Sequence, residues 1–439
     1  MNQRWTLHVE NFARIESADI EISPLMCFIG DNNSGKSYIM ALLWGLLYHS
    51  WYFLFSDNEV AVEKQKICAV WRKEHFEKNC VIDDNATQRY LELFNALLDF
   101  YKERIVSDIF NQNIPVGKLE IRNLKNSHDI SLYYSQSEIC IKNQETLFEM
   151  KGLNYQKWIN IDFAICWSLI MGGITTRYPI EEATNRPIYL PASRTGLLLV
   201  HKLIASKATR NIFSINSVED FQGRLTAPYV QFLELLIKLQ NTAEITDESK
   251  LSLIKFLQNE IMHGTIQVKE DNKIIRYTPE DSNTELPMSI TSSVVTETAS
   301  LLLLLTTRIP LRLVVIEEPE AHLHPALQKK IAQLLIRFAH NDIPVWITTH
   351  SDTILQHFNN MIKLNNRPEE ERKELLKEFG YTEEDLLSPE EINLYQFERG
   401  DKHTTIQKLQ SGKYGFVVPS FNKAIDRLMS EIFAFQEDD

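Results

Sequence analysis

The sequence predicts an α/β fold, in which a mixed sheet with flanking helices carries a mainly helical insertion. Short apolar runs that end in polar residues alternate with segments of helical periodicity, a pattern typical of parallel strands covered by helices. Near both ends of the chain, short alternating segments separated by turn residues predict further strands, which makes the sheet mixed. The apolar runs are residues 26–29, 186–190, 311–316 and 344–348.

The first 56 residues are expected to form the N-terminal lobe of the main domain. Residues 7–22 alternate between apolar and polar side chains, which predicts two or three short strands. Residues 26–29 form a short buried strand, and a nearly continuous apolar stretch follows at 38–55. A glycine, a histidine and a serine interrupt that stretch, so we interpret it as a buried helix and not as a membrane span.

Residues 57–165 are expected to be an insertion, either a helical arm or a helical layer packed on the core. Apolar side chains between Tyr90 and Ile109 recur at three- and four-residue spacing, which predicts an amphipathic helix, and residues 118–150 alternate like strands. Residues 166–439 complete the main domain as its C-terminal lobe. There the patterns predict helices at 229–262 and 325–339, a hairpin at 265–269 and 273–277, a solvated helix and loop at 368–389, paired strands at 392–397 and 403–409, and a final helix from about Ser420.

The composition is that of an ordinary globular protein. The 439 residues are 44% hydrophobic, and 46 Lys and Arg against 59 Asp and Glu give a net charge of −13. Such a balance does not favour broad electrostatic adhesion to nucleic acid or anionic lipid. The five cysteines show no C-x-x-C spacing, and the N-terminus has no signal-peptide pattern, so we expect a reducing, cytoplasmic setting.

A phosphate-loop pattern, Gly30-x-x-x-x-Gly35-Lys36-Ser37, lies between a predicted strand and a predicted helix. Its glycines let successive backbone N–H groups point at a phosphate, and the helix N-terminus adds a favourable dipole. Lys36 is placed to reach the β- and γ-phosphates, and the Ser37 hydroxyl to ligate Mg²⁺. The candidate ATP-binding residues of this loop are Gly30, Asn32, Asn33, Ser34, Gly35, Lys36, Ser37 and Tyr38.

Two adjacent carboxylates, Glu317 and Glu318, follow the apolar run at 313–316. Ligands of open α/β sheets lie at the carboxyl ends of the strands, where these acids stand. We expect Glu317 to join Ser37 in supporting Mg²⁺ and Glu318 to polarise the attacking water. His350 ends the next predicted strand, where it can contact the γ-phosphate. Glu318 and His350 are therefore the candidate catalytic residues.

These three elements, in this order, resemble the ABC-type ATPase heads of the SMC/RecF/OLD group. The stretch from Glu317 to Pro325 is similar to the Walker B motif and D-loop of that group, and Thr349-His350-Ser351 to its H-loop. The resemblance covers about the first 50 residues and roughly 185–400. Pro191-Ala192-Ser193-Arg194 is similar to a motif of OLD-type and related defence ATPases, in which Arg194 would either sense phosphate or brace a loop.

The same family places a signature motif at a helix N-terminus, where it completes the ATP site of a second subunit. The residues from Thr291 to Glu297 occupy that place. The resemblance implies that Ser292 and Ser293 bind the nucleotide of a partner copy and that the protein is at least a dimer. Two residues depart from the family pattern, since Val294 stands in place of a small glycine and Glu317 in place of an aspartate.

Many OLD proteins carry a Toprim nuclease after the ATPase, but the 89 residues after His350 contain no Asp-x-Asp pair. The chain therefore resembles the ATPase subunits of bacterial anti-phage defence systems, of the PtuA (Septu) or AriA type. The resemblance implies a separate nuclease effector of the HNH or Toprim type, nucleic acid reached through the complex, and no membrane contact.

Two alternatives stay open. The altered signature is compatible with an oligomeric scaffold or sensor that hydrolyses ATP slowly. A RecF-like DNA-repair ATPase is the other alternative, although the acidic charge does not favour it. Glu320, His322 and His324 do not reproduce a zinc-binding spacing, and the D-loop resemblance accounts for them.

Overall fold

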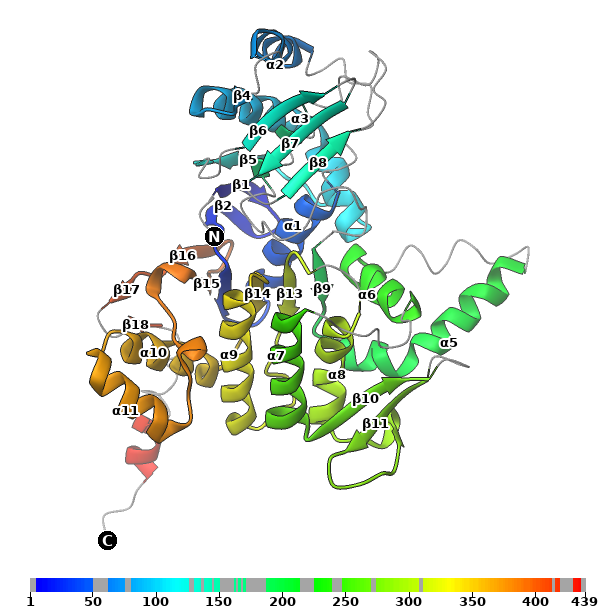
Figure 1. The fold of residues 1–439 in the computed structure, drawn as a ribbon, viewed down its shortest axis with the longest axis vertical. Helices are drawn as coiled ribbons and strands as arrows, with labels where there is room; N and C mark the ends of the chain where they lie inside the picture. The colour runs from blue at the N-terminus through cyan, green and yellow to red at the C-terminus, as the bar shows by residue number, and fades with distance from the viewer. Residues whose placement is uncertain are drawn as a thin grey trace.

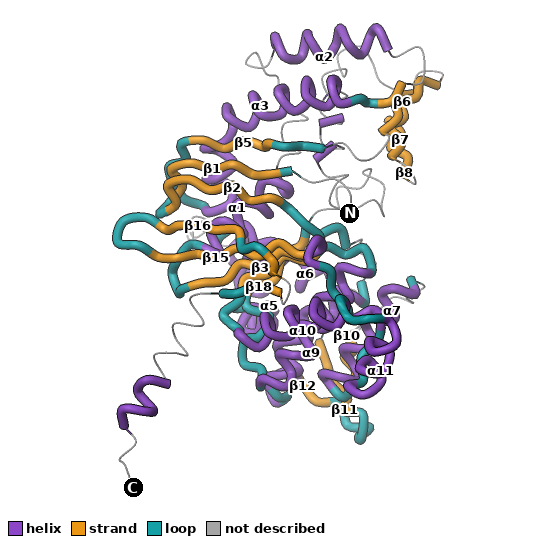
Figure 2. The backbone as a smooth tube through the Cα atoms, turned by 90° about the vertical axis from the view of Figure 1, so that its left-hand side faces the viewer, coloured by secondary structure: helices purple, strands orange, loops and turns teal. Residues whose placement is uncertain are grey.

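A nine-stranded mixed sheet runs through the part of the chain that the structure, a computed structural model, describes. Its order is β5-β1-β2-β16-β15-β3-β14-β13-β9. Figure 2 labels the part of the sheet from β5 to β3. The described residues are 5–49, 62–75, 80–125, 130–135, 138–143, 146–150, 162, 165–166, 169–170, 187–213, 225–238, 247–269, 274–307, 311–412, 415–418 and 429–435. The strands of the sheet are β1 (Thr6–Phe12), β2 (Ile15–Glu21), β3 (Leu25–Gly30), β5 (Lys118–Arg122), β9 (Ile188–Leu190), β13 (Val314–Glu317), β14 (Val345–Thr348), β15 (Ile392–Arg399) and β16 (Thr404–Lys408).

Five neighbouring strands of this sheet, β15, β3, β14, β13 and β9, are parallel. Every residue of β3, β9, β13 and β14 is buried, as expected for parallel strands that helices cover on both faces. At the other side, β1 pairs antiparallel with both β2 and β5, and β15 pairs antiparallel with β16. The predicted α/β fold with a mixed sheet and flanking helices is therefore confirmed.

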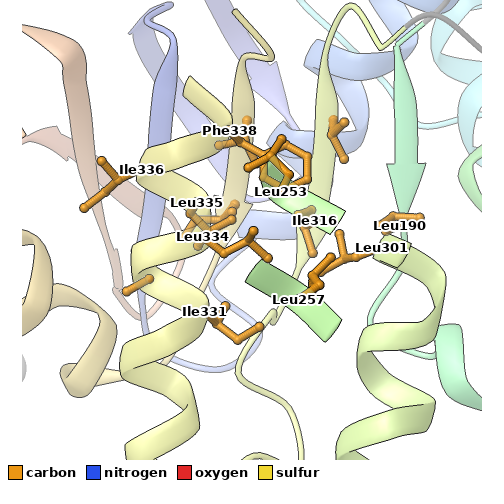
Figure 3. Packing of buried hydrophobic residues seen from close by; sticks show 14 of the residues in the cluster. Leu190, Leu253, Leu257, Leu301, Ile316, Ile331, Leu334, Leu335, Ile336 and Phe338 are labelled. Carbon is orange, nitrogen blue, oxygen red and sulfur yellow. The ribbon is translucent and has the colours of Figure 1, made fainter. Parts of the chain in front are cut away.

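Helices cover the two faces of the sheet and form two hydrophobic cores. One core joins β1 and β2 to α1 and α3, and the other joins the parallel strands to α7, α8 and α9. Figure 3 shows side chains of α7, α8 and α9, among them Leu257, Leu301 and Ile331, converging near Ile316 of β13. The larger helices are α1 (Lys36–His49), α2 (Val62–His75), α3 (Asp84–Phe110), α5 (Arg194–Phe213), α6 (Ala227–Lys238), α7 (Glu248–Leu257), α8 (Ser293–Leu305), α9 (Pro325–His340), α10 (Asp352–Asn365) and α11 (Glu369–Phe379).

The region 57–165 contains helices and strands in its described part. The long helix α3 packs against α1 and β5, and β5 is itself the edge strand of the large sheet. Next to α3 in Figure 1 lies a smaller sheet of order β4-β6-β7-β8, formed by β4 (Cys80–Val81), β6 (Ile130–Ser135), β7 (Glu138–Asn143) and β8 (Thr146–Met150). The helix expected at 90–109 and the strands expected in 118–150 are present, whereas a separate role for this region stays a prediction.

Most of the other predicted elements of the C-terminal lobe are also present, whereas the start of the final helix expected from about Ser420 lies outside the described residues. The hairpin consists of β10 (Gly264–Val268) and β11 (Ile275–Pro279), to which β12 (Leu286–Pro287) adds a third strand. The helix predicted at 229–262 is divided into α6, α7 and a π-helical turn at Gln258–Met262. The other described elements are short 3-10 turns (Met288–Ile290, Glu383–Asp385 and Pro389–Glu391), the strand pair β17 (Ser411–Gly412) and β18 (Gly415–Phe416), and a helical segment at 429–435.

The described part of the apolar stretch after the phosphate loop is a mostly buried helix. Helix α1 buries most of its side chains and ends at His49, while residues 50–61 lie outside the described part. Among the helices described, none combines the length and the apolar character needed to cross a bilayer. The thiols of Cys27, Cys68 and Cys166 are free and buried.

Candidate functional site

Four neighbouring parallel strands bring the predicted site residues to one edge of the sheet. Strand β3 ends at Gly30, β14 at Thr348, β13 at Glu317 and β9 at Leu190. Because parallel strands share the edge at which their carboxyl ends lie, the segments that follow them meet there. The phosphate loop, the H-loop, the paired acids and the segment that leads to Arg194 therefore lie side by side.

The phosphate loop needs its first glycine for two reasons. Gly30 has φ +133°, in the region that L side chains rarely adopt, and a Cβ on it would lie 2.1 Å from the carbonyl oxygen of Phe397 on the neighbouring β15. Asn33 and Gly35 also have positive φ angles, of 59° and 95°. The chain thus turns tightly between β3 and the start of α1 at Lys36.

Lys36 lies folded onto its own loop. Its Nζ donates to the carbonyl oxygens of Gly30 (3.0 Å) and Asp31 (2.7 Å). Burial lowers the pKa of Lys36 to about 8, against the opposing effect of the nearby Glu318, Asp31 and Glu320 carboxylates. The Ser34 hydroxyl oxygen is buried in the same loop without a hydrogen-bond partner. A buried cation and an unpartnered hydroxyl fit an anionic, oxygen-rich ligand such as a polyphosphate.

Glu317 is buried at the end of β13, and both of its carboxylate oxygens have partners. Oε1 accepts a hydrogen bond from the Tyr189 hydroxyl (2.7 Å), and Oε2 accepts one from the Ala192 backbone N–H (3.0 Å). Burial, and then the Glu317 charge, raise the pKa of Tyr189 well above its usual value. A carboxylate has about four lone pairs, so two acceptor positions of Glu317 remain for a metal-bound water.

Glu318 is far more accessible than its neighbour. Its side chain is 44% exposed and its Oε1 lies 4.0 Å from Nε2 of His350. Its backbone has φ +44°, in the left-handed region, and its N–H donates to the carbonyl oxygen of Thr348 (2.9 Å). Burial and the Lys36 charge lower the pKa of His350. A free carboxylate beside a neutral imidazole can accept a proton from a water molecule.

Glu320 ties the D-loop to the H-loop. One of its carboxylate oxygens accepts a hydrogen bond from the His350 backbone N–H (2.7 Å), and the Thr349 hydroxyl also hydrogen-bonds to it. Burial raises its pKa despite these bonds. A second link joins the Ser351 hydroxyl to Oε1 of Gln328 on α9 (2.6 Å). The backbone of His350 is thereby held in place relative to the Glu317–Glu318 segment.

The two signature serines lie at the N-terminus of α8 and are exposed. Ser292 is the N-cap residue, whose side chain accepts a hydrogen bond from the Val295 N–H (3.5 Å), and the Ser293 hydroxyl donates to the carbonyl oxygen of His322 (3.5 Å). In the described part of the chain, no hydrogen bond joins either serine to the phosphate loop. The structure thus brings Lys36, Glu318 and His350 together but leaves the serines apart from them.

The other candidate residues of the loop face outward. Asn32, Asn33, Ser37 and Tyr38 are exposed, with Tyr38 stacked on Phe110 at 5.2 Å between ring centroids. Tyr189 and Phe110 are site neighbours that sequence reasoning missed, because they lie on β9 and α3, far from the loop in sequence. Among the described residues, no group of three or more His, Cys, Asp and Glu side chains could hold a metal ion.

Two family models match the chain. The model described as an AAA ATPase domain matches residues 6–165, and the model described as AAA domain, putative AbiEii toxin, Type IV TA system matches residues 193–356. The first match contains the phosphate loop, and the second contains the paired acids, the signature serines and His350. Together the two matches support a P-loop ATPase.

Three solved structures of SMC heads align with most of the chain at low sequence identity. An SMC head bound to the C-terminal winged-helix domain of ScpA has 11% identity and a TM-score of 0.39, and covers 93% of this chain and 98% of its own. The SMC head domain from Thermotoga maritima has 11% identity and a TM-score of 0.35, with 93% of this chain and 100% of its own covered. The SMC head with an extended coiled coil, bound to the C-terminal domain of ScpA from Pyrococcus furiosus, has 10% identity, a TM-score of 0.36, and coverage of 97% and 98%. No curated protein matches the chain significantly.

Proposed function

We propose that this chain is a Mg²⁺-dependent ATPase of the SMC/RecF/OLD type, which binds ATP on the phosphate loop and hydrolyses it in a dimer. The observation that carries the proposal is the meeting of Lys36, Glu318 and His350 at one edge of a parallel sheet, with an unpartnered buried hydroxyl inside the loop. This is the arrangement that phosphoryl transfer requires, since catalysis there is mostly positioning and charge stabilisation.

In this proposal each residue of the site has its own role in binding or hydrolysis. Lys36 exchanges its two backbone carbonyl acceptors for phosphate oxygens, which offer full negative charge in place of partial charge. Glu318 orients the attacking water and receives its proton as the bond to the γ-phosphorus forms and the bond to the ADP oxygen breaks. The polar hydrogen of the neutral His350 ring can donate to the γ-phosphate. Ser37 and Glu317 would hold Mg²⁺, which neutralises phosphate charge when bound.

The position of Ser292 and Ser293 supports the proposed dimer. They lie exposed at a helix N-terminus, which is suited to an anion, and they have no hydrogen bond to the phosphate loop of their own chain. In the proposed dimer, each pair of serines contacts the nucleotide bound to the other copy.

ATP binding by the wild type and by Lys36→Ala tests this function. We expect wild type to bind ATP with Mg²⁺ and Lys36→Ala to lose binding by more than about 100-fold, since a buried charge-assisted contact disappears. Lys238→Ala is the matched control, because Lys238 lies on the surface of α6 with a side chain that is 73% exposed. Tight ATP binding by Lys36→Ala would remove the proposed site.

For the biological role, we propose an ATPase subunit of an anti-phage defence complex that acts in the cytoplasm and controls a separate nuclease of the HNH or Toprim type. The resemblance of Pro191-Ala192-Ser193-Arg194 to a motif of OLD-type and related defence ATPases supports this role. Tagged Glu318→Gln protein, purified from its native host, should retain a stoichiometric nuclease that a tagged Lys36→Ala protein loses. Recovery of DNA and repair factors instead would favour a RecF-like repair ATPase.

A slow-hydrolysing scaffold or sensor is the second candidate, and Val294 in the signature favours it. A side chain larger than glycine at that position hinders the close approach of a partner's phosphate. Turnover by the isolated chain well above background, abolished in Glu318→Gln, would reject the scaffold.

A further inference from the structure

Arg194 lies buried between the signature helix and the paired acids. It is the first residue of α5, close to the carboxyl end of β9, and is 1% exposed. Its Nη1 donates to the carbonyl oxygen of Glu317 (2.7 Å) and its Nη2 to that of Glu318 (3.1 Å). Its Nε donates to the carbonyl oxygen of Glu297 (3.3 Å). Each of its three guanidinium nitrogens thus makes a hydrogen bond inside the fold, and Arg194 is buried away from a ligand at the surface.

The charge that balances Arg194 comes from the signature helix. Glu297 lies on α8, one turn beyond Ser293, and its side chain is 2% exposed. Its Oε2 lies 3.1 Å from Nη2 of Arg194. Because arginine stays protonated in proteins, this buried carboxylate must follow the guanidinium or leave an uncompensated charge. A displacement of the first turns of α8 therefore moves the guanidinium of Arg194 as well.

At its other end, the guanidinium holds the backbone on both sides of Glu318. The carbonyl oxygens of Glu317 and Glu318 belong to the two peptide groups that flank the Cα atom of Glu318. Glu318 has φ +44°, a conformation that costs free energy in a residue with a side chain and that persists only where surrounding contacts impose it. The direction of the Glu318 side chain thus depends on where Arg194 lies.

We propose that Arg194 is a positioning residue that couples the signature helix α8 to Glu318, through its ion pair with Glu297 and its bonds to the two peptides around Glu318. This inference rests on the proposed function and adds its regulation. When the serines of α8 engage the nucleotide of a second copy, α8 and Glu297 fix the guanidinium, and the carboxylate of Glu318 is held in its catalytic direction. Hydrolysis then requires the assembled dimer, although ATP binding does not.

The first test is Glu297→Gln, which keeps the shape of the side chain but removes the charge that holds Arg194. The matched control is Asp385→Asn, because the Asp385 side chain is also buried (0% exposed) and pairs with Arg337 (2.6 and 3.0 Å) between α9 and a 3-10 turn. Both changes convert a buried, arginine-paired acid into its amide. They differ in whether the pair touches α8 and the Glu318 segment.

We expect Glu297→Gln to lower kcat by at least about tenfold while KM and the Kd for ATP change by less than about twofold. Asp385→Asn should leave kcat within about twofold of wild type, even if it lowers the melting temperature as much as Glu297→Gln does. Unchanged kcat in folded Glu297→Gln, or an equal loss of kcat in Asp385→Asn, would overturn the proposal. If Glu297→Gln does not fold, Glu297→Asp keeps the charge but shortens its reach, and the same loss of kcat is expected.

Hydrogen exchange provides a second measurement that does not depend on turnover. In the wild type with a non-hydrolysable ATP analogue, raising the protein concentration should slow exchange in the first turn of α8 and in residues 317–323 with one common midpoint. Separate midpoints, or protection of α8 alone, would overturn the coupling.

Without nucleotide, Glu297→Gln should accelerate exchange at 317–323 and Asp385→Asn should not. If the ATP analogue has no effect on exchange at residues 30–37, the proposed function is rejected. The comparison of the two variants without nucleotide would still decide whether Glu297 stabilises residues 317–323.

Discussion

The two halves of the candidate ATP site are built in opposite ways. In the phosphate-loop half, Lys36, Glu317 and Glu320 are buried or partly buried and all have partners in their own chain. In the signature half, Ser292 and Ser293 stand exposed at the first turn of α8. The first half is complete within one chain, whereas the second presents its donors to the outside. This difference is what a site shared between two copies requires.

The difference also separates binding from turnover. A ligand on the phosphate loop replaces contacts that already exist, so a single chain can bind it. In the proposed dimer, the serines can add their hydrogen bonds only when a second copy supplies the nucleotide, so their contribution is expected in turnover. Variants of the two halves should therefore differ in whether they change ATP binding or turnover.

Glu318→Gln should lower turnover by about 10²–10⁴-fold, because the amide cannot accept the proton of the attacking water. ATP affinity should stay within about threefold of wild type, since the Lys36 contacts are untouched. Phosphate release and equilibrium binding measure the two quantities. Glu260→Gln on the surface near α9 is the control. Turnover preserved in Glu318→Gln would show that another group accepts the proton of the attacking water.

Replacing both Ser292 and Ser293 by Ala should lower turnover by about 10²-fold, the usual effect of removing donors to a developing charge. ATP binding by the isolated chain should not change. Mixing this variant with Lys36→Ala should restore about a quarter of the wild-type turnover, because half of the dimers then contain one complete site. Loss of ATP binding in the serine variant, or no recovery on mixing, would mean that the two halves act within one chain.

Raising the pH should weaken ATP binding through Lys36. Burial lowers the pKa of Lys36 to about 8 in the free protein, so the ammonium is mostly present at pH 7.5 and mostly lost at pH 9. Bound phosphates favour the charged form and raise its pKa, so the Kd for ATP should increase by roughly tenfold over this interval. Calorimetric titrations at constant free Mg²⁺ measure the change. A flat profile would show that Lys36 is not the group that binds the phosphates.

Single substitutions of the two serines should separate a structural role from a ligand role. Ser292 is the N-cap residue of α8, so Ser292→Ala should lower the free energy of unfolding by about 1 kcal/mol. Ser293→Ala should cost less than about 0.5 kcal/mol, since its side chain is exposed and makes one long hydrogen bond. Denaturant unfolding measures both. Equal losses of stability would remove the distinction between the serines.

Local patterns in the sequence were sufficient to predict the phosphate loop, the buried strands and most helices. The glycines and lysine at 30–37 act through their own backbone and the next helix, and the runs at 313–316 and 344–348 are apolar because each strand is covered on both faces. These properties depend on neighbours in sequence. The meeting of Lys36, Glu318 and His350 also followed, because carboxyl ends of parallel strands share one edge.

Other features were decided only by the tertiary structure. The strands β15 and β16 were expected as a pair, but their place between β2 and β3 is set by pairing with residues hundreds of positions away. Tyr189 became a partner of Glu317 because β9 lies beside β13. Arg194 bonds to the carbonyl oxygen of Glu297, 103 residues away, a partner that no local pattern indicates. Contacts of this kind leave no local period or spacing, because their geometry exists only after the sheet and its helices have assembled.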